Sequence, residues 1–257
     1  MSDSTFDDPK DGPGRPGLPG PEEPARAEAE ALARRLEALG NVLSHDLRNP
    51  IAAIAWTSKA LVKRGGLDER QLDAVGRIAA VARRMERLVG ELLDFARAPR
   101  LGGVPVQPGR ADVELACTRA IEEERELHPD RQVRFARSGP NDGPWDPGRL
   151  QELVADLVAH ALGRAPEGTV VEVTAAATEG ELLVTVRDEG PALSAEALSV
   201  LFDPLRGGDL GGSVGLGLYV AREIARAHGG DVRAASDPAD GTSLTARLPR
   251  SGAEPGR

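Results

Sequence analysis

The chain has 257 residues, of which 40% are apolar and 28% charged, and its formal net charge at pH 7 is −9. This length accommodates two modest domains, or one domain and a helical module. The acidic balance, with arginines scattered among glutamates, argues against nucleic-acid binding, which needs clustered basic side chains, so we expect a protein partner.

The apolar segments are short. The longest uninterrupted one, Ile51 to Trp56, is far below the roughly 20 residues that cross a bilayer, and the N-terminus is acidic and rich in Pro and Gly. We therefore expect a soluble, cytoplasmic chain without membrane insertion. The single cysteine, Cys117, excludes an intramolecular disulfide framework and is expected to be a small apolar helix residue.

Residues 1–24 have almost nothing apolar to bury, which predicts a disordered tail. From residue 25 the apolar positions follow a helical period, and the break at Arg64-Gly65-Gly66-Leu67 ends that helix. Asp68 and Gln71 then form the pattern of a capping box that opens a second helix, which we expect Pro99 to stop. The first stripe contains Leu32, Leu36, Leu39, Leu43, Leu47, Pro50, Ile54 and Leu61, and the second contains Leu72, Val75, Ile78, Ala82, Met85, Val89, Leu92 and Ala96.

Residues 25–98 are thus predicted to form an antiparallel helical hairpin. Each apolar face is too long for one neighbouring helix to cover, so the pattern predicts a homodimer in which two hairpins form a four-helix bundle.

The first helix carries Ser44-His45-Asp46-Leu47-Arg48-Asn49-Pro50. At about 100° per residue, His45 lies about 200° from Leu43 and Leu47, which places it opposite the apolar seam and in water. A histidine on the polar face of a helix is most often only solvated, so any functional role for His45 must be inferred from the residues around it. Asn49 follows one turn later on the same face, and Pro50 is expected to bend the helix beside these polar groups.

The remainder, residues 104–250, alternates helical and strand patterns and predicts an α+β layer, with helices over one face of a mixed sheet. Residues 251–257 are expected to be a disordered tail. The expected helices are 111–127, 146–162, 194–201 and 217–228, and the expected strands are 132–136, 169–177, 181–187, 231–236 and 242–248.

The heptapeptide around His45 resembles the H box of two-component histidine kinases, and residues 104–250 resemble the Bergerat-type ATPase domain that these kinases share with certain chaperones, gyrase and mismatch-repair proteins. Together the resemblance covers nearly all of residues 38–249. It implies that His45 is phosphorylated, that Asp46 orients the imidazole and takes its proton, and that Asn49 positions water for dephosphorylating a partner. A neutral imidazole beside a carboxylate is a competent nucleophile for a phosphoryl group.

Within the ATPase-like part, Asp188 ends an apolar strand and enters Glu189-Gly190-Pro191. A carboxylate there can accept the exocyclic amine of adenine, and Gly190 lets the backbone approach, although an acid at a strand-ending turn is also common without a ligand. Thr242 follows Gly241 as in the family's last glycine box. Gly215, Leu216, Gly217 and Leu218 lead into a helix whose N-terminal N–H groups can face a triphosphate, and the glycine-rich residues before them are typical of a lid.

The N box departs from the family pattern. Two asparagines four apart, an alanine, a lysine and an aromatic are usual, and the chain has Asp156, His160, Ala161, Gly163 and Arg164 there. The second asparagine normally gives Mg²⁺ an oxygen ligand, for which the His160 imidazole is a poorer substitute. Asp156 could supply oxygen instead, and Arg164 could replace the lysine near the phosphates or stack on adenine. The alternative is that the site has lost nucleotide binding.

Two functions follow from these observations. The first is an ATP-dependent histidine kinase that phosphorylates His45 from Mg-ATP and passes the phosphoryl group to a response-regulator aspartate, with possible phosphatase activity on that regulator and a separate sensor protein as a further partner. The second is a dimeric histidine phosphotransfer or scaffold protein whose degenerate ATPase domain does not use ATP. Asp188 and the glycines at 215 and 217 favour the first, and the altered N box favours the second. A serine kinase with a similar ATPase domain would lack the H box and the hairpin.

Overall fold

The structure is a computed structural model that describes residues 47–101, 103–204, 206 and 216–251. The predicted sites at His45, Asp46 and Gly215 lie outside these residues, as do the predicted tails apart from Ser251, and so does the part of the first helix that precedes Leu47.

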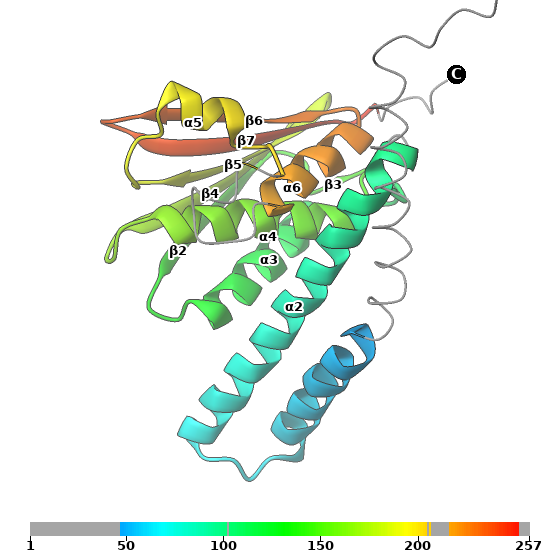
Figure 1. Ribbon diagram of the computed structural model, residues 1–257, viewed down its shortest axis with the longest axis vertical. Helices are drawn as coiled ribbons and strands as arrows, with labels where there is room; N and C mark the ends of the chain where they lie inside the picture. The colour runs from blue at the N-terminus through cyan, green and yellow to red at the C-terminus, as the bar shows by residue number, and fades with distance from the viewer. Residues whose placement is uncertain (1–46, 102, 205, 207–215, 252–257) are drawn as a thin grey trace, which may run out of the picture.

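The helical hairpin is present. Its first helix is described over residues 47–64, and α2 runs antiparallel to it over Glu69–Leu101 (Figure 1). Gly65 and Gly66 make the turn with φ of 73° and 82°, a region of backbone space that glycine enters without strain. The predicted capping box opens α2: the N–H of Asp68 donates to Gln71 Oε1 at 3.0 Å, and the N–H of Gln71 donates to Asp68 Oδ1 at 2.9 Å.

The expectation that Pro99 stops this helix is wrong, because α2 continues to Leu101. A proline removes one helical hydrogen bond but keeps a φ that suits a helix, so a last turn can continue past it. The bend expected at Pro50 concerns a segment of which only the residues from Leu47 onward are described.

The α+β part of the chain follows the predicted order of elements. Its sheet has the strand order β2-β4-β5-β7-β6, in which β2 and β4 are parallel and all other neighbours are antiparallel. A pair of two-residue strands, β1 and β3, was not expected from the sequence. The bounds are β1 Ala111–Asp112, α3 Val113–Leu127, β2 Gln132–Ser138, β3 Asp142–Gly143, α4 Pro147–Arg164, β4 Val170–Ala177, β5 Glu181–Asp188, α5 Ala195–Val200, α6 Leu216–Ala227, β6 Asp231–Asp237 and β7 Gly241–Pro249.

The core lies between one face of this sheet and the helices α3, α4 and α6. Buried and partly exposed residues alternate along β5, so that Leu182, Val184 and Val186 point inward. They meet the apolar face of α4, where Leu150, Leu153 and Leu157 are fully buried. The spacing of these leucines, three and then four residues, places them on one face of the helix. The expected α+β architecture, with helices over one face of a mixed sheet, is confirmed.

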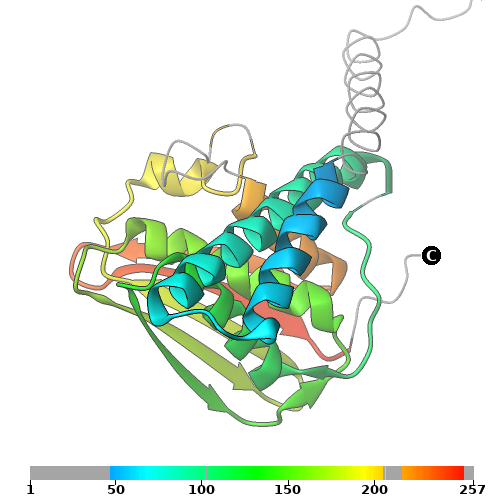
Figure 2. The same ribbon diagram turned by 90° about the horizontal axis from the view of Figure 1, so that it is seen from below.

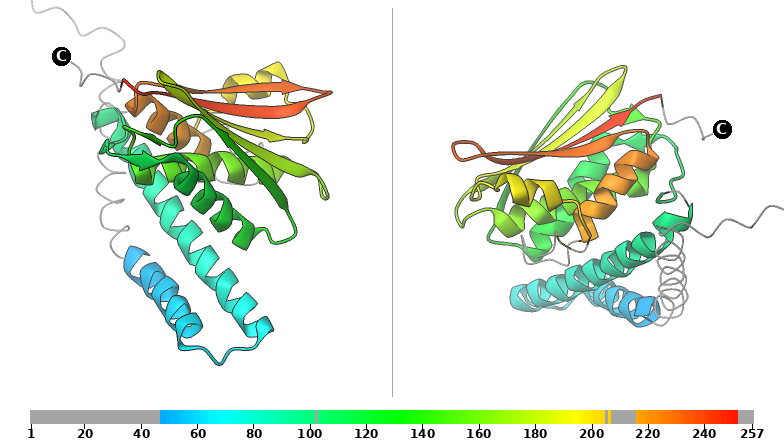
Figure 3. Two further views of the ribbon diagram at one scale, coloured as in Figure 1. Left: turned by 180° about the vertical axis from the view of Figure 1, so that it is seen from behind. Right: turned by 45° about the horizontal axis from the view of Figure 1, so that its top comes forward.

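The hairpin forms a third layer (Figures 1 and 2). Seen from below, it crosses the helices on the side away from the sheet, and Figure 3 shows the same order of layers from two further directions. The α2 helix packs on α3 and α6, and the edge of the Phe95 ring meets the Tyr219 ring with their centroids 5.6 Å apart. Across the described ranges, no helix combines the length and apolar character that a bilayer crossing requires.

Candidate functional site

The helix α4 is fixed at its start by two interactions. Asp146 caps it, accepting hydrogen bonds from the N–H groups of Gly148 at 2.9 Å and Arg149 at 3.1 Å. The N–H of Asp146 in turn donates to Nε2 of His228 at 3.0 Å, and Nδ1 of the same ring lies 2.8 Å from the Ile224 carbonyl oxygen. His228 is therefore a neutral imidazole that donates from Nδ1 and ties α4 to the end of α6.

A stripe of three polar residues runs along α4. Asp156, His160 and Arg164 follow one another at intervals of four, so they share one face of the helix. Arg164 lies at the end of β5, and Asp156 lies against Gly217 at the start of α6, where an added Cβ at residue 217 would be 3.5 Å from the carboxyl carbon. The stripe thus joins the two segments in which the sequence predicts nucleotide contacts.

Asp188 forms one end of this site. Its side chain is 1% exposed, and Oδ1 accepts the N–H of Gly190 at 2.8 Å. Burial raises the pKa of the Asp188 carboxyl, while the Gly190 N–H and the positive charge of Arg164 act in the opposite direction. A Cβ at residue 190 would lie 2.5 Å from Asp188 Oδ1 and 2.8 Å from the Arg164 carbonyl oxygen, so only glycine fits there.

Thr242 and Arg164 complete this end. Thr242 pairs directly with Asp188 across β5 and β7, is fully buried, and shares a 2.8 Å hydrogen bond with the Ser236 hydroxyl. The Arg164 guanidinium donates to the Pro191 carbonyl and reaches Thr242 Oγ1 at 3.4 Å, and its Nε lies 3.9 Å from Asp188 Oδ1. The structure therefore brings together four of the predicted residues, from three segments of the chain: Arg164, Asp188, Gly190 and Thr242.

The other end of the site lies where α6 begins. Leu216 and Leu218 are buried, while Gly217 faces Asp156 without a side chain between them. Leu218 is part of the core cluster, so it anchors the first turn of α6. Burial of Leu216 and Leu218 thus holds the backbone of this turn, and their predicted contact with a nucleotide stays a prediction.

Asp156 is buried, and charged residues of α2 act on its carboxyl. Burial raises the pKa of its carboxyl well above the usual value, the neighbouring carboxylates Glu91 and Glu152 raise it further, and Arg87 acts against them. Within the part of the chain that the structure describes, Asp156 Oδ2 has no hydrogen-bond partner. These surroundings favour the protonated acid, which is a poor metal ligand.

His160 is the other candidate metal ligand. Its Nε2 is buried and, among the residues described, has no hydrogen-bond partner. Burial lowers the pKa of the imidazole to about 4, and the nearby Arg164 charge contributes in the same direction. The ring is therefore neutral near pH 7 and retains a nitrogen lone pair for a ligand.

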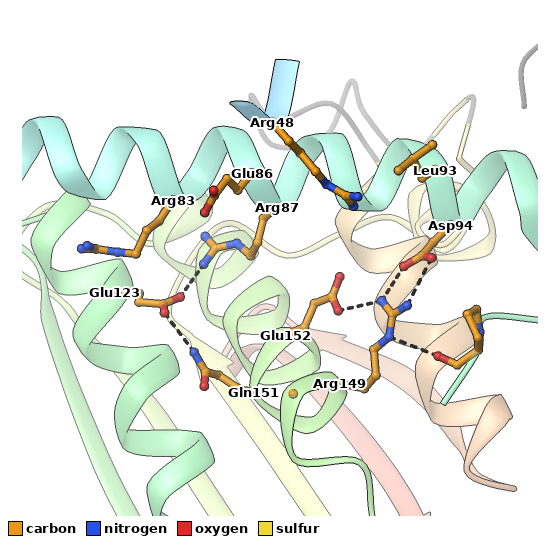
Figure 4. A pocket seen from close by; sticks show the side chains of 13 residues that line it. Arg48, Arg83, Glu86, Arg87, Leu93, Asp94, Glu123, Arg149, Gln151 and Glu152 are labelled. Carbon is orange, nitrogen blue, oxygen red and sulfur yellow. Dashed lines mark hydrogen bonds and ion pairs between the residues drawn. The ribbon is translucent and has the colours of Figure 1, made fainter. Parts of the chain in front are cut away.

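Charged residues on α2 hold the hairpin against the ATPase-like part, and the sequence did not predict this contact. Asp94 accepts two hydrogen bonds from Arg149, which also donates to Glu152 at 2.8 Å (Figure 4). Nearby, Arg87 donates to Glu123 at 2.9 Å and to the fully buried Glu124. We call these residues the α2 clamp: Arg87, Asp94, Glu123, Glu124, Arg149 and Glu152.

A cavity of about 550 Å³ lies beside the α2 clamp. Arg48, which comes from the first hairpin helix, extends toward it from the side of α2 that faces away from α3 and α4 (Figure 4). Most of the charged groups that line the cavity are paired with one another, and two of these pairs join α2 to α3 or α4. The cavity therefore lies at the contact between the hairpin and the helices beneath it.

Two families match the chain, each in its own region. Residues 35–100 match the family described as the His Kinase A (phospho-acceptor) domain, and residues 145–252 match the family described as the histidine kinase-, DNA gyrase B- and HSP90-like ATPase. The first range contains the hairpin and the H box, and the second contains α4, Asp188 and Thr242.

Two curated histidine kinases are similar in sequence to most of this chain. The probable sensor histidine kinase TcrY of Mycobacterium tuberculosis is 30% identical over 239 residues, which are 90% of this chain and 49% of TcrY. The sensor histidine kinase ZraS of Klebsiella oxytoca is 30% identical over 234 residues, which are 88% of this chain and 49% of ZraS. The chain thus spans about half the length of these two curated relatives.

The fold has solved counterparts. The crystal structure of full-length ShkA in complex with AMPPNP covers 84% of this chain and 46% of that chain, with a TM-score of 0.57 and 22% identity. Together with the two family matches and the curated relatives, the hairpin and the mixed sheet lead to one assignment: the chain belongs to the family of two-component sensor histidine kinases.

Proposed function

We propose that the chain is an ATP-dependent histidine kinase that phosphorylates His45 and then passes the phosphoryl group to an aspartate of a response regulator. The observation that carries this proposal is the buried group formed by Asp188, Gly190, Arg164 and Thr242. A scaffold has no use for a buried carboxylate, a position without room for a Cβ and an arginine gathered at one end of a helical stripe.

In this proposal each residue acts on ATP in a definite way. Asp188 accepts the exocyclic amine of adenine, and Arg164 and Thr242 bound the same end of the site. The backbone around Gly215 to Leu218 faces the phosphates. A ring nitrogen of His45 then attacks the γ-phosphorus, the bond to the β–γ bridging oxygen breaks, and ADP leaves. Asp46 takes the imidazole proton, and Asn49 positions water when the regulator is dephosphorylated.

A divalent cation, expected to be Mg²⁺, would neutralise phosphate charge when bound. Asp156 and His160 are the residues at its position, and they fit such an ion only in part. The Asp156 carboxyl is buried under α2 in surroundings that favour its neutral form, whereas the neutral His160 imidazole has an unpartnered nitrogen in the part of the chain that is described.

The partners belong to the same proposal. Exposed apolar side chains on the hairpin, including Leu72, Ile78, Met85 and Leu92, support a homodimer in which a second hairpin covers them. We further propose a response-regulator receiver domain as the phosphoryl acceptor, a separate protein as the sensor, and the cytoplasm, where ATP is available, as the place of action.

The scaffold remains a second candidate because of one observation. Asp156 is buried, and its burial together with the charges of Glu91 and Glu152 raises the pKa of its carboxyl, so the start of the N box presents a neutral acid. A domain used only for docking would tolerate the loss of this metal ligand, with His45 phosphorylated by another protein.

A labelling experiment tests the proposal. The full chain incubated with γ-labelled ATP and a divalent cation, Mg²⁺ or Mn²⁺, should acquire label that acid releases and base does not, and His45→Ala should acquire none. Asp188→Asn should lose most of the label, because an amide presents an N–H toward the adenine amine. Absence of label in the unmodified chain with both cations would favour the scaffold, and calorimetric titration with a non-hydrolysable ATP analogue would then show whether nucleotide binds at all.

A further inference from the structure

The proposed nucleotide site would offer a divalent cation an unusual set of protein donors. The helix α4 offers an imidazole at residue 160 and a buried carboxyl at residue 156, with no carboxamide at either position. A hard ion such as Mg²⁺ prefers oxygen ligands, and imidazole suits Mn²⁺ and the later first-row divalent metals better. The donor set therefore bears on which ion the site accepts.

The position of His160 within the site supports a role for its nitrogen. One helical turn before it, Asp156 contacts Gly217 at the proposed phosphate end, and one turn after it, Arg164 contacts Thr242 and Asp188 at the proposed adenine end. His160 therefore lies between the segments that would hold the two ends of a nucleotide.

The state of the His160 ring also fits a metal ligand. Among the described residues, its buried Nε2 has no hydrogen-bond partner, and an unpaired buried polar atom is destabilising unless a ligand satisfies it.

Side chains of the described residues do not form a complete metal site at this position. No group of three or more His, Cys, Asp and Glu residues in the described ranges could hold a metal ion by itself. An ion at this position would thus depend on phosphate oxygens for most of its ligands, as nucleotide-bound cations do, with the protein contributing a single donor. The identity of this one protein ligand can then change which divalent ion the nucleotide site prefers.

We propose that His160 makes the nucleotide site selective for a nitrogen-accepting divalent cation, of which Mn²⁺ is the representative, over Mg²⁺. This inference rests on the proposed function, because it requires that ATP binds. In this proposal the His160 imidazole coordinates the nucleotide-bound ion directly.

Two measurements on the full chain test this proposal. Calorimetric titration with a non-hydrolysable ATP analogue should give binding about tenfold tighter with Mn²⁺ than with Mg²⁺, and His160→Asn, which restores an oxygen donor, should remove or reverse that preference. Pulsed electron paramagnetic resonance of the Mn²⁺ complex should show a nitrogen coupling that changes on ¹⁵N-histidine labelling and vanishes in His160→Asn. His128→Asn is the matched control, because His128 lies at the end of α3, apart from the α4 stripe.

The outcomes separate the two proposals. Nucleotide binding with equal affinity for both ions and no nitrogen coupling would overturn the cation assignment while leaving the kinase proposal in place. A nitrogen coupling that persists in His160→Asn would place the ligand at another histidine and also overturn it. No nucleotide binding with either cation, or without any, would overturn both proposals together.

Discussion

The α2 clamp gives a prediction about how the hairpin stays docked. Arg149 is the best connected member, because it donates twice to Asp94, once to Glu152 and once to the Pro105 carbonyl. The side chain of Asp94 is 7% exposed, and that of Arg149 is 20% exposed. Arg149→Met would keep most of the volume of the side chain while leaving the Asp94 carboxylate buried without its partner.

The magnitude follows from this burial. Removing one partner of a buried ion pair costs about 3–5 kcal/mol, and the partial exposure of Arg149 reduces the expected loss to about 2–3 kcal/mol. Docking of α2 on the rest of the chain should therefore weaken by roughly a hundredfold. Arg149→Met with Asp94→Leu should recover part of that loss, because the double variant removes the buried Asp94 carboxylate and leaves only Glu152 without its partner.

Distances between spin labels at positions 70 and 233, on α2 and β6, would measure docking. The native thiol of Cys117 is fully buried, and burial raises its pKa to about 12, so it should escape labelling. Arg77→Met is the matched control, because the Arg77–Asp73 pair on the same helix is exposed and contributes little. A distance distribution that is identical in Arg149→Met and Arg77→Met, with the fold intact by circular dichroism, would refute the reasoning.

Three further predictions concern single positions. Burial raises the pKa of Glu91 from 4.5 to about 7, so the docked state holds a proton that the undocked helix releases. Docking of α2 should therefore weaken by about 3 kcal/mol as the pH rises from 4.5 to 7. Glu91→Gln should flatten this pH profile in the same distance measurement. Gly241 has a φ of 77° and an added Cβ would collide with the Asp188 carbonyl, so Gly241→Ala should lower the free energy of unfolding by about 3 kcal/mol in urea titrations. His228→Ala removes the acceptor of the Asp146 N–H and should cost about 2–3 kcal/mol in the same titrations, whereas a loss below 0.5 kcal/mol, about the size of a surface substitution, would contradict the tie between α4 and α6.

Much of the fold could be predicted because local patterns determine it. The capping box at Asp68 and the glycine turn before it depend on neighbours within four residues, and both form as predicted. The convergence of Asp188 and Thr242 follows from strand pairing, since β5 and β7 are neighbours in register. In contrast, β1 and β3 are two residues long, too short for any periodicity to indicate them.

The docking of the hairpin could not be predicted from these patterns. Asp94 and Arg149 are 55 positions apart, and a charged residue on a helix surface normally faces water. The apolar stripe of α2 identifies the face that a second hairpin is expected to cover, but a face that docks through ion pairs leaves no periodic apolar signal. The same limit applies to Asp156, because Glu91 and Arg87, which act on the pKa of its carboxyl, belong to a different layer.

The two faces of α2 have different chemistry, and this difference matches two different tasks in the proposed function. The face with Ile78, Met85 and Leu92 is apolar and exposed, which suits a permanent contact with a second hairpin. The face with Arg87 and Asp94 binds the ATPase part through ion pairs, whose desolvation cost offsets most of their attraction. A kinase domain that must leave α2 to bring ATP to His45 needs a contact of that second kind, because a purely apolar contact of the same extent would oppose release.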